Sequence, residues 1–465
     1  MNDIKIMMLS KRKIKRGFFI TTASIITIYL LVSFYFINHF FFSTEINGVN
    51  VSLISHDMAS DIFQIFTNDY KLQLLERNSE TEIITGHDIG LYFNRNFDLS
   101  QLHSMQNPFL WIGALFKKHS YYLDHLYVLD QGLLTNKINH LHCLNKDTTE
   151  PHSPTFLYSD GSYIVTKERY GDRINLVQLS NAVIQSILHG DAKLDLNKKD
   201  CYVNPLYTLH SKKTSMTRSL LNSYVSAKII YHFGNVSEQV DSSLIHQWLS
   251  VDNNLDITID KDRIANYIRA LSKKYDTVGI PREFHTSTGT NIIVNGGLYG
   301  WKINRELETN ALYQHIIRGD IMDKEPEYVQ KALSREGNEI GNTYIEINIS
   351  RQHVWFYKNG KLLVQGAVVT GNPNRGNATV LGVYMINYKQ RNATLVGENY
   401  SSKVTYWMPF FGNMGLHDAS WRSSFGGKIY LSRGSHGCVN APLYLAKIVY
   451  ENSTPGTPII VYEEN

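Results

Sequence analysis

The residues best suited to chemistry lie near the C-terminus, in the run Ser-His-Gly-Cys-Val-Asn at Ser435–Asn440. A cysteine thiolate attacks carbonyl carbons well, and a nearby base or cation supplies the thiolate at neutral pH. A second histidine, His417, lies upstream, with 17 residues between it and Ser435. That separation is too long for one helix face, so the chain must fold back, as two strands joined by a long loop do. The sequence therefore predicts Cys438 as a nucleophile in an active site that also contains His417.

The N-terminus carries a long apolar segment preceded by basic residues. No Asp, Glu, Lys or Arg occurs from Gly17 to Thr44, and about 20 apolar residues suffice to cross a bilayer as a helix. Before this segment, six basic side chains stand against the single Asp3. Positive charge stays on the cytoplasmic side, so we expect a cytoplasmic basic tail (1–16), a transmembrane helix (17–43) and the remainder outside the cell. A cleaved signal peptide is the rival interpretation, but the apolar run is too long and no small-residue cleavage pattern follows it.

Charge and cysteine content exclude other classes of protein. The whole chain has a formal net charge of +4. The basic tail accounts for that excess, so the remainder is close to neutral and nothing in it indicates a nucleic-acid partner. Three cysteines in 465 residues are too few for an extracellular disulfide framework. We interpret Cys143 and Cys201 as small buried residues, and a bridge between them is the alternative.

An internal repeat divides the middle of the chain. Tyr170-Gly171-x-x-Ile174-Asn175 recurs as Tyr299-Gly300-x-x-Ile303-Asn304 at an offset of 129 residues. Apolar residues at helical spacing follow in both copies, and we expect Gly190 and Gly319 to end those helices. Strand-like segments precede both helices. The pattern therefore predicts two copies of one mixed α+β unit.

After the repeats, the pattern changes to that of strands. The segment 344–349 alternates apolar and polar residues at period two, and Asn359-Gly360 between two apolar runs predicts a type I′ hairpin turn. In this part of the chain, only 443–450 has a clear helical pattern. The predicted fold class is therefore α+β multidomain: a transmembrane helix, two tandem mixed α+β repeats, and a mainly-β C-terminal domain.

Residues 344–464 resemble the catalytic domain of L,D-transpeptidases, the cysteine enzymes that cross-link peptidoglycan. The signature of that family is a histidine, a spacer of this length, Ser or Thr, then His-Gly-Cys, an apolar residue and Asn or Arg; His417 and Ser435–Asn440 supply it. The run Gly415–Trp421 looks like the subgroup of Gram-positive bacteria. One departure is Val380, which replaces a proline usual in the family and removes no reacting group.

The repeats are similar to a peptidoglycan-binding domain that precedes this catalytic domain. The match is good in the second copy, with Lys274-Tyr275-Asp276-Thr277 and Gly297-x-Tyr299-Gly300-Trp301, whereas Asp172 replaces Trp301 in the first. The expected domains are repeat 1 at 44–210, repeat 2 at 211–338 and the catalytic domain at 342–465. Two roles are equally open for the repeats. They bind glycan or stem peptide, or they act as a spacer.

The resemblance implies a reaction through an acyl-enzyme. Cys438 attacks the carbonyl that joins the third residue of a tetrapeptide stem to the fourth, D-Ala leaves, and the amine of a second stem attacks the thioester to give a 3→3 cross-link. His417 is the base, and the backbone carbonyl of Asp418 orients it. No cofactor or metal is implied, because a zinc site of His417, His436 and Cys438 would lack a fourth ligand.

Other residues of the signature have expected roles. The amides of Gly437 and Cys438 are expected to stabilise the oxyanion, and His436 to bind or polarise substrate, with a structural hydrogen bond as the alternative. The candidate substrate-binding residues are Ser435, Asn440 and Trp421. For the first two, ties at a strand end and a helix start are the favoured interpretation.

The expected function is a membrane-anchored peptidoglycan L,D-transpeptidase of cell-wall biogenesis, with its catalytic domain at a Gram-positive wall. Its expected partners are the donor tetrapeptide and acceptor amine of peptidoglycan stems, and the membrane. One alternative is an L,D-carboxypeptidase, in which water replaces the acceptor amine. Another is a non-catalytic wall-binding protein, against which the intact pair of His417 and Cys438 argues. A sortase is disfavoured because that family has Thr where this chain has Gly437.

Overall fold

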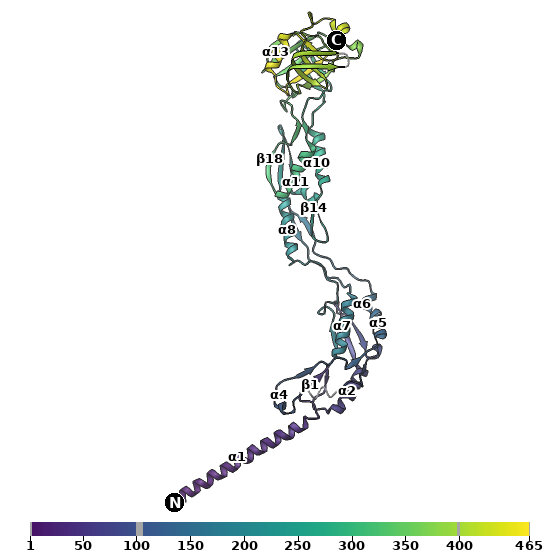
Figure 1. The fold of residues 1–465 in the computed structure, drawn as a ribbon, viewed down its shortest axis with the longest axis vertical. Coiled ribbons are helices and arrows are strands. Elements are labelled where there is room, and N and C mark those ends of the chain that lie inside the picture. Colours follow the sequence, from purple (N-terminus) through teal and green to yellow (C-terminus); the bar gives the residue numbers. More distant parts are fainter. Residues whose placement is uncertain (1, 99–105, 398–399, 465) are drawn as a thin grey trace. The chain divides into compact units, whose positions relative to one another are not determined.

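The computed structural model describes residues 2–98, 106–397 and 400–464, and the side chains of most of the basic tail lie outside it. The described chain forms two compact units (Figure 1). The first unit holds the residues up to 155 together with 166–211, and the second holds 156–165 together with all residues from 212 onward.

The N-terminal helix α1 (Asn2–Tyr35) contains a segment, Lys15–Tyr35, that is long and apolar enough to cross a membrane. The helix ends earlier than the expected span 17–43. Beyond Tyr35 the apolar run pairs with the protein instead: Phe40 N donates to Ile54 O, and Phe40 is 2% exposed within the core of the first unit. Backbone pairing and burial of the phenylalanines therefore end the helix.

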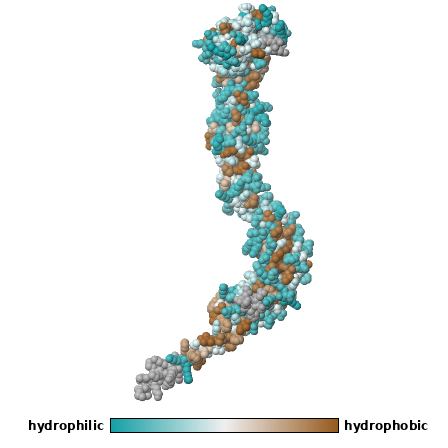
Figure 2. All heavy atoms as spheres, in the orientation of Figure 1, coloured by the Kyte–Doolittle hydropathy of each residue, from teal (hydrophilic) through white to brown (hydrophobic). Residues whose placement is uncertain are grey.

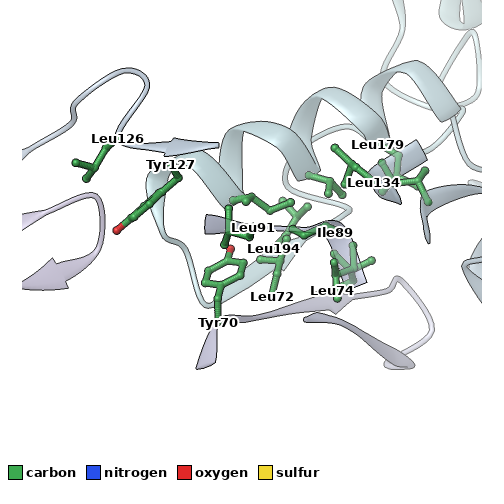
Figure 3. Packing of buried hydrophobic residues seen from close by; sticks show 14 of the residues in the cluster. Tyr70, Leu72, Leu74, Ile89, Leu91, Leu126, Tyr127, Leu134, Leu179 and Leu194 are labelled. Atoms are coloured by element: carbon green, nitrogen blue, oxygen red, sulfur yellow. The ribbon is translucent and has the colours of Figure 1, made fainter. Parts of the chain in front are cut away.

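The core of the first unit lies between short strands and several helices. Strands β3 (Lys71–Leu75) and β4 (Thr81–Thr85) are antiparallel, and β10 (Lys193–Asp195) joins β3 in parallel. Figure 3 shows Leu72 and Leu74 of β3, Leu194 of β10 and Leu179 of α7 (Leu176–His189) turned into one apolar cluster. The other main elements of this unit are β1 (Thr44–Ile46), β2 (Val49–Asn50), α2 (His56–Asp69), β5 (Tyr92–Phe93), α4 (Trp111–Ala114), β6 (His119–Tyr121), β7 (Tyr127–Val128), α5 (Gln131–Asn139) and α6 (His142–Asn145).

The second unit repeats one arrangement of the first, in which α2 precedes the antiparallel pair β3 and β4 and β10 joins β3 in parallel. Helix α8 (Lys212–Val225) precedes the antiparallel pair β11 (Lys228–Phe233) and β12 (Val236–Val240), and β18 (Ile321–Lys324) joins β11 in parallel. Between α8 and the C-terminal domain, its other main elements are α9 (Ser242–Ile245), β13 (Leu249–Val251), β14 (Ile257–Ile259), α10 (Lys261–Tyr275), β15 (Arg282–His285), β16 (Asn291–Val294), β17 (Lys302–Ile303), α11 (Arg305–Arg318) and β19 (Tyr328–Gln330).

Helices α7 and α11 have matching ends. They begin after the N-caps Asn175 and Asn304, whose side chains accept a backbone N–H of the first turn, and they end at Gly190 and Gly319 in the left-handed conformation. A residue with a Cβ adopts that conformation at a cost, which is why glycine ends many helices. The predicted glycine caps are therefore confirmed at both positions.

One hairpin lies in a different unit from its neighbours in sequence. Strands β8 (Phe156–Ser159) and β9 (Ser162–Val165) belong to the second unit, where Tyr163 N donates to Asn222 Oδ1 at 2.6 Å and Tyr158 stacks on His246 at 4.0 Å. The expected domain range 44–210 places this hairpin in repeat 1, whereas the structure places it in the second unit. Burial of Tyr163 against α8 and its neighbours is the physical reason for the difference.

The C-terminal domain consists of two sheets and a covering helix. The first sheet has the strand order β22-β21-β20-β28-β23, and the second has the order β24-β25-β26-β27. Helix α13 (Leu443–Asn452) contacts β22, β25 and β26, and the buried side chains of both sheets form one core. The strands are β20 (Tyr344–Asn348), β21 (His353–Lys358), β22 (Lys361–Ala367), β23 (Gly382–Met385), β24 (Gln390–Gly397), β25 (Tyr400–Phe411), β26 (Met414–Asp418), β27 (Val439–Ala441) and β28 (Pro458–Tyr462).

The turn between β21 and β22 has the predicted geometry. Asn359 and Gly360 have φ values of 53° and 77°, and positive φ at both central positions defines a type I′ turn. The long hairpin of β24 and β25 was not predicted, although it contributes to the site described below.

The β15–β16 hairpin packs directly on the first sheet of the C-terminal domain. Its turn residue Ser287 donates through both N and Oγ to the carboxylate of Glu346 on β20, and Tyr462 OH donates to the same carboxylate. Glu346 is fully buried. A buried carboxylate costs free energy unless hydrogen bonds satisfy it, so these donors tie the hairpin to the C-terminal domain.

We expect Glu346→Ala to lower the free energy of unfolding of the second unit by about 3 kcal/mol, because it leaves buried donors without an acceptor. The matched control is Glu283→Ala, at an exposed glutamate of β15, which should change stability by less than about 0.5 kcal/mol. Thermal unfolding of both variants, followed by circular dichroism, makes the comparison. Equal stabilities of the two variants would contradict the role given to Glu346.

Candidate active site

Two parallel strands bring His417 and Cys438 to the same edge of the second sheet. His417 lies on β26 opposite Asn440 of β27, and Cys438 is the residue immediately before β27. The intervening chain returns through a loop and the short helix α12 (Ile429–Arg433). Both side chains line one pocket. The fold therefore brings the two residues together in the way that the spacing predicted.

The imidazole of His417 is buried, with 3% of the residue exposed. Its Nδ1 lies 2.9 Å from the backbone oxygen of Asp418, so Nδ1 carries the hydrogen and Nε2 carries the lone pair. Burial lowers the pKa of His417 below its ordinary value, outweighing the opposing effect of that hydrogen bond. The ring is therefore a neutral base near pH 7, with Nε2 as its basic atom.

The carboxylate of Asp418 has a different partner from its carbonyl. Its Oδ1 accepts the backbone N–H groups of Thr405 and Tyr406 at 2.8 and 2.7 Å. These bonds hold β26 against β25. Asp418 thus orients His417 through its main chain and fixes the strand through its side chain.

The thiol of Cys438 is buried at 8% exposure. Burial raises its pKa to about 11, while a hydrogen bond from the Gly415 amide acts in the opposite direction. The sulfur also lies 3.5 Å from the backbone oxygen of Asn413. At neutral pH the resting group is consequently the thiol, and a base must take its proton for attack to proceed.

Internal hydrogen bonds shape the loop before Cys438. Ser435 Oγ donates to Cys438 O and accepts Gly437 N at 3.1 Å, and Thr379 Oγ1 donates to Gly437 O at 2.8 Å. Gly437 has φ +115°, where a Cβ would also meet Met414. Because the Gly437 amide already has an acceptor, this geometry argues against its expected use as an oxyanion donor. Ser435 serves as a tie within this loop.

Asn440 links His417 to a residue that sequence reasoning missed. In the amide orientation that satisfies both neighbours, its nitrogen lies 3.1 Å from His417 Nε2 and its oxygen accepts Arg422 Nε at 2.8 Å and Nη2 at 3.2 Å. Asn440 lies in β27 and does not begin a helix. A charged residue in the run that follows His417 was the available signal for Arg422.

One pocket contains the cysteine and the residues around it. It is lined by Leu395, Ser402, His417, Trp421, Arg422, Gly434, Ser435, His436, Cys438 and Asn440. Trp421 is half exposed, with its ring centroid 5.9 Å from that of His417, whereas Trp407 and Phe410 belong to the buried core. His436 is exposed at the pocket. Leu395 and Ser402 come from the unpredicted β24–β25 hairpin.

Cysteines elsewhere have other surroundings. Cys143 and Cys201 are buried and free, as Cys438 is. Among the described residues, the possible ligand atoms of Glu76, Glu82 and Cys143 lie within 4.8 Å of one another, close enough to hold a metal ion. Glu82 there accepts the amides of His142 and Cys143 at the start of α6, and Glu76 pairs with Lys146. A helix cap and an ion pair account for that cluster.

Comparison with known proteins identifies the family. Residues 342–461 match the YkuD family, described as L,D-transpeptidase catalytic domain, and residues 207–323 match a family described as "Putative peptidoglycan binding domain". A cysteine-to-serine mutant of Enterococcus faecium L,D-transpeptidase is 30% identical, covering 54% of this chain and 100% of its own, with a TM-score of 0.42. The chain belongs to the L,D-transpeptidase family.

Two further structures align with the catalytic domain. The E. faecium L,D-transpeptidase catalytic domain, alone and acylated by ertapenem, is 38% identical over 26% of this chain and over 97% and 98% of its own, both with a TM-score of 0.25. The comparison with curated proteins finds no match. This L,D-transpeptidase therefore combines the catalytic domain with a peptidoglycan-binding domain in one chain.

Proposed function

We propose that this enzyme forms 3→3 cross-links in peptidoglycan through a thioester on Cys438. The observation that carries the proposal is the placement of His417 on β26 and of Cys438 immediately before the parallel strand β27, with both side chains lining one pocket. The neutral imidazole has its lone pair at Nε2, and the thiol needs a base. These two states complement each other in general-base catalysis.

The first half-reaction transfers the stem to the enzyme. His417 Nε2 takes the proton of Cys438 as sulfur attacks the carbonyl carbon of the third stem residue. The C–N bond to D-Ala then breaks, and the departing nitrogen takes the proton from the imidazolium. The Cys438 amide is the oxyanion donor that remains from the expected pair. The enzyme now carries a thioester, and His417 is again neutral.

The second half-reaction transfers the stem to an acceptor. The side-chain amine of another stem attacks the thioester carbon, His417 accepts a proton from that nitrogen, and the thiol leaves after receiving it. A new amide replaces the thioester. Water in place of the amine would give the carboxypeptidase reaction, and the pocket residues do not distinguish the two. His436 and Trp421 line the pocket and are proposed to contact the stem.

The rest of the chain is proposed to hold this site at the wall. α1 crosses the cell membrane with the basic tail inside, because positive charge is retained on the cytoplasmic side. The two repeats, at 44–210 without the β8–β9 hairpin and at 211–338, are proposed to be duplicated peptidoglycan-binding modules. The matching ends of α7 and α11 and the family match of the second module support this.

Products formed by the purified full-length enzyme in detergent test the proposed reaction. With a tetrapeptide donor and an acceptor stem, mass spectrometry should detect a dimer with the mass of both stems minus D-Ala. A tripeptide as sole product would favour the carboxypeptidase. Unchanged substrate would overturn the proposal.

A further inference from the structure

A short segment of the first unit exposes large apolar side chains to an unusual degree. Residues 107–118 form the 3-10 helix η2 (Pro108–Leu110), helix α4 and the chain up to Lys118. Its exposed apolar side chains, with their exposed fractions, are Phe109 (52%), Leu110 (65%), Ile112 (49%), Leu115 (51%) and Phe116 (86%). Scattered exposed apolar residues are ordinary, but a contiguous group of this size marks a surface that binds something apolar.

This segment is attached to the outer part of α1. Tyr29 OH donates to Phe109 O at 2.6 Å, and the Trp111 ring lies 6.0 Å from that of Tyr29. Ala114 is buried against Phe36, just beyond the helix. In Figure 2, hydrophobic residues follow α1 and continue onto the adjoining part of the first unit. The segment and the membrane helix are therefore one packed structure.

The attachment fixes the depth of the segment. Tyr29 precedes the helix end at Tyr35 by six residues, which is roughly 9 Å along the axis at 1.5 Å per residue. The apolar stretch of α1 spans roughly 28 Å in the same way, close to the thickness of a hydrocarbon core of about 30 Å. If α1 crosses the membrane, the Phe109 backbone beside Tyr29 lies at the level of the outer leaflet.

The chemistry of the segment fits that depth. Its apolar side chains suit the acyl region, and Trp111 and Tyr29 are residue types that gather at membrane interfaces. Lys117 follows directly, where a long basic side chain reaches the phosphates while its stem stays in apolar surroundings. The neighbouring Lys118 pairs with Glu45 instead.

We propose that residues 107–118 are a second membrane contact, which lies in the outer-leaflet interface beside α1 and holds the first unit against the lipid surface. The proposal rests on the membrane anchoring given under the proposed function. It adds a lipid-binding surface that the anchor alone does not require. A second copy of the chain is the rival occupant of this surface.

Nitroxide labels on the full-length protein in phosphatidylglycerol–phosphatidylcholine vesicles test the proposal. Leu110→Cys carries the test label, Leu133→Cys on α5 is a matched exposed leucine (47%), and Leu31→Cys (65%) reports on α1. Unsubstituted protein gives the background from the buried native cysteines. Electron paramagnetic resonance compares accessibility to oxygen, which partitions into lipid, with accessibility to a water-soluble nickel chelate.

We expect the oxygen-to-nickel accessibility ratio at 110 to approach that at 31 and to exceed that at 133 several-fold. A label at 110 as accessible to nickel as that at 133, with 31 still in lipid, would overturn the proposal and leave the anchor intact. Nickel access at all three positions would overturn the anchor itself. Shelter at 110 from both reagents, with spin–spin broadening, would assign the surface to a second copy.

An independent observation concerns Arg422 in the active-site pocket. Among the described residues, no carboxylate pairs with its guanidinium, while Nε and Nη2 face Asn440. Burial and then the neighbouring Arg433 lower its pKa, yet an arginine keeps its charge in proteins. A half-buried cation without a counter-ion in a substrate pocket points to an anionic group of the ligand.

The position of Arg422 indicates which anion it meets. Asn440 lies between Arg422 and His417 Nε2, and His417 must protonate the nitrogen of the leaving residue. In D-Ala the carboxylate is attached to the carbon that bears this nitrogen. We infer that Arg422 binds the carboxylate of the leaving residue and thereby selects stems that end one residue after the scissile bond. This inference also rests on the proposed reaction.

Two donor peptides distinguish carboxylate binding by Arg422 from an indirect role in which Arg422 positions His417 through Asn440. One is the tetrapeptide with its free carboxylate, and the other is the same peptide with a C-terminal amide. The wild type should prefer the carboxylate by about 10- to 100-fold in kcat/KM, the value of a charge-assisted hydrogen bond. Arg422→Gln should remove that preference, because it lowers kcat/KM for the carboxylate donor far more than for the amide donor. Arg433→Gln, the control, should keep the preference.

Equal use of both donors by the wild type would overturn this inference while leaving the proposed reaction intact. An equal loss for both donors in Arg422→Gln would also overturn it and make Arg422 a positioning residue. No acylation of the wild type by either donor would instead overturn the proposed reaction.

Discussion

Cys438→Ala is expected to lower the rate of D-Ala release from a tetrapeptide donor by at least about 10³-fold. Alanine removes the sulfur that forms the thioester, and the pocket offers no second thiol among the described residues. The measurement is D-Ala release by the purified full-length variant, together with its thermal unfolding. Because Cys438 is buried and small, alanine should leave the fold in place.

Cys201→Ala is the matched control for this prediction. Cys201 is also a buried free cysteine, but it lies in the core of the first unit. Its substitution should leave D-Ala release within about twofold while costing a small amount of stability. If Cys438→Ala retained the wild-type rate, or if Cys201→Ala lost it instead, the assigned nucleophile would be wrong.

His417→Ala is expected to lower kcat/KM by about 10²- to 10⁴-fold at pH 7, the usual contribution of general-base catalysis. His353→Ala is the control, since His353 is a half-buried histidine of β21 that bonds Gln365 instead of lining the pocket. Rates of acylation by the tetrapeptide give the comparison. Similar losses in both variants would indicate a general effect on the domain.

The pH dependence of the wild type follows from the same two groups. Because burial lowers the pKa of His417, the imidazole becomes protonated, and kcat/KM falls, only below the ordinary histidine range. Because the Cys438 pKa is raised to about 11, the thiol form persists on the alkaline side, and no loss is expected up to about pH 9.

Removal of His417 should change the shape of that profile. Without the base, reaction depends on the pre-formed thiolate, whose fraction rises about tenfold per pH unit below the thiol pKa. The His417→Ala profile should therefore rise steadily from about pH 6 to about pH 9 instead of remaining flat. A flat profile in the variant would show that another group takes the proton.

The reacting groups could be predicted from sequence because they occur in contiguous runs. Cys438 and its neighbours form one loop, and His417 precedes them by a distance that suits two strands. Local rules also placed the Asn359-Gly360 turn and the glycine ends of α7 and α11, since each depends on a few neighbouring backbone angles.

Contacts that depend on strand register were not predictable in this way. Asn440 faces His417 only because β26 and β27 pair in parallel at that register, and Arg422 reaches Asn440 through a loop. The sequence suggested that the Gly437 amide could bind an oxyanion, whereas in the structure this amide donates to Ser435 Oγ. Hydrogen-bond partners of this kind follow from the folded backbone, which periodicity does not specify.

Tertiary burial also changed two expected boundaries. The apolar run through 43 resembles one continuous helix, but Phe40 contributes more as core of the first unit, so α1 ends at Tyr35. The β8–β9 hairpin follows Tyr163 into the second unit. In both cases aromatic side chains bury large areas, and that gain outweighs the local pattern.

Mass spectrometry of peptides from the enzyme, quenched in acid during turnover of a tetrapeptide donor, tests the central claim most directly. We predict that the peptide containing Cys438 carries the stem without its D-Ala, as an adduct that hydroxylamine removes. An adduct on Cys143 or Cys201, or turnover during which the peptide containing Cys438 stays unmodified, would contradict it.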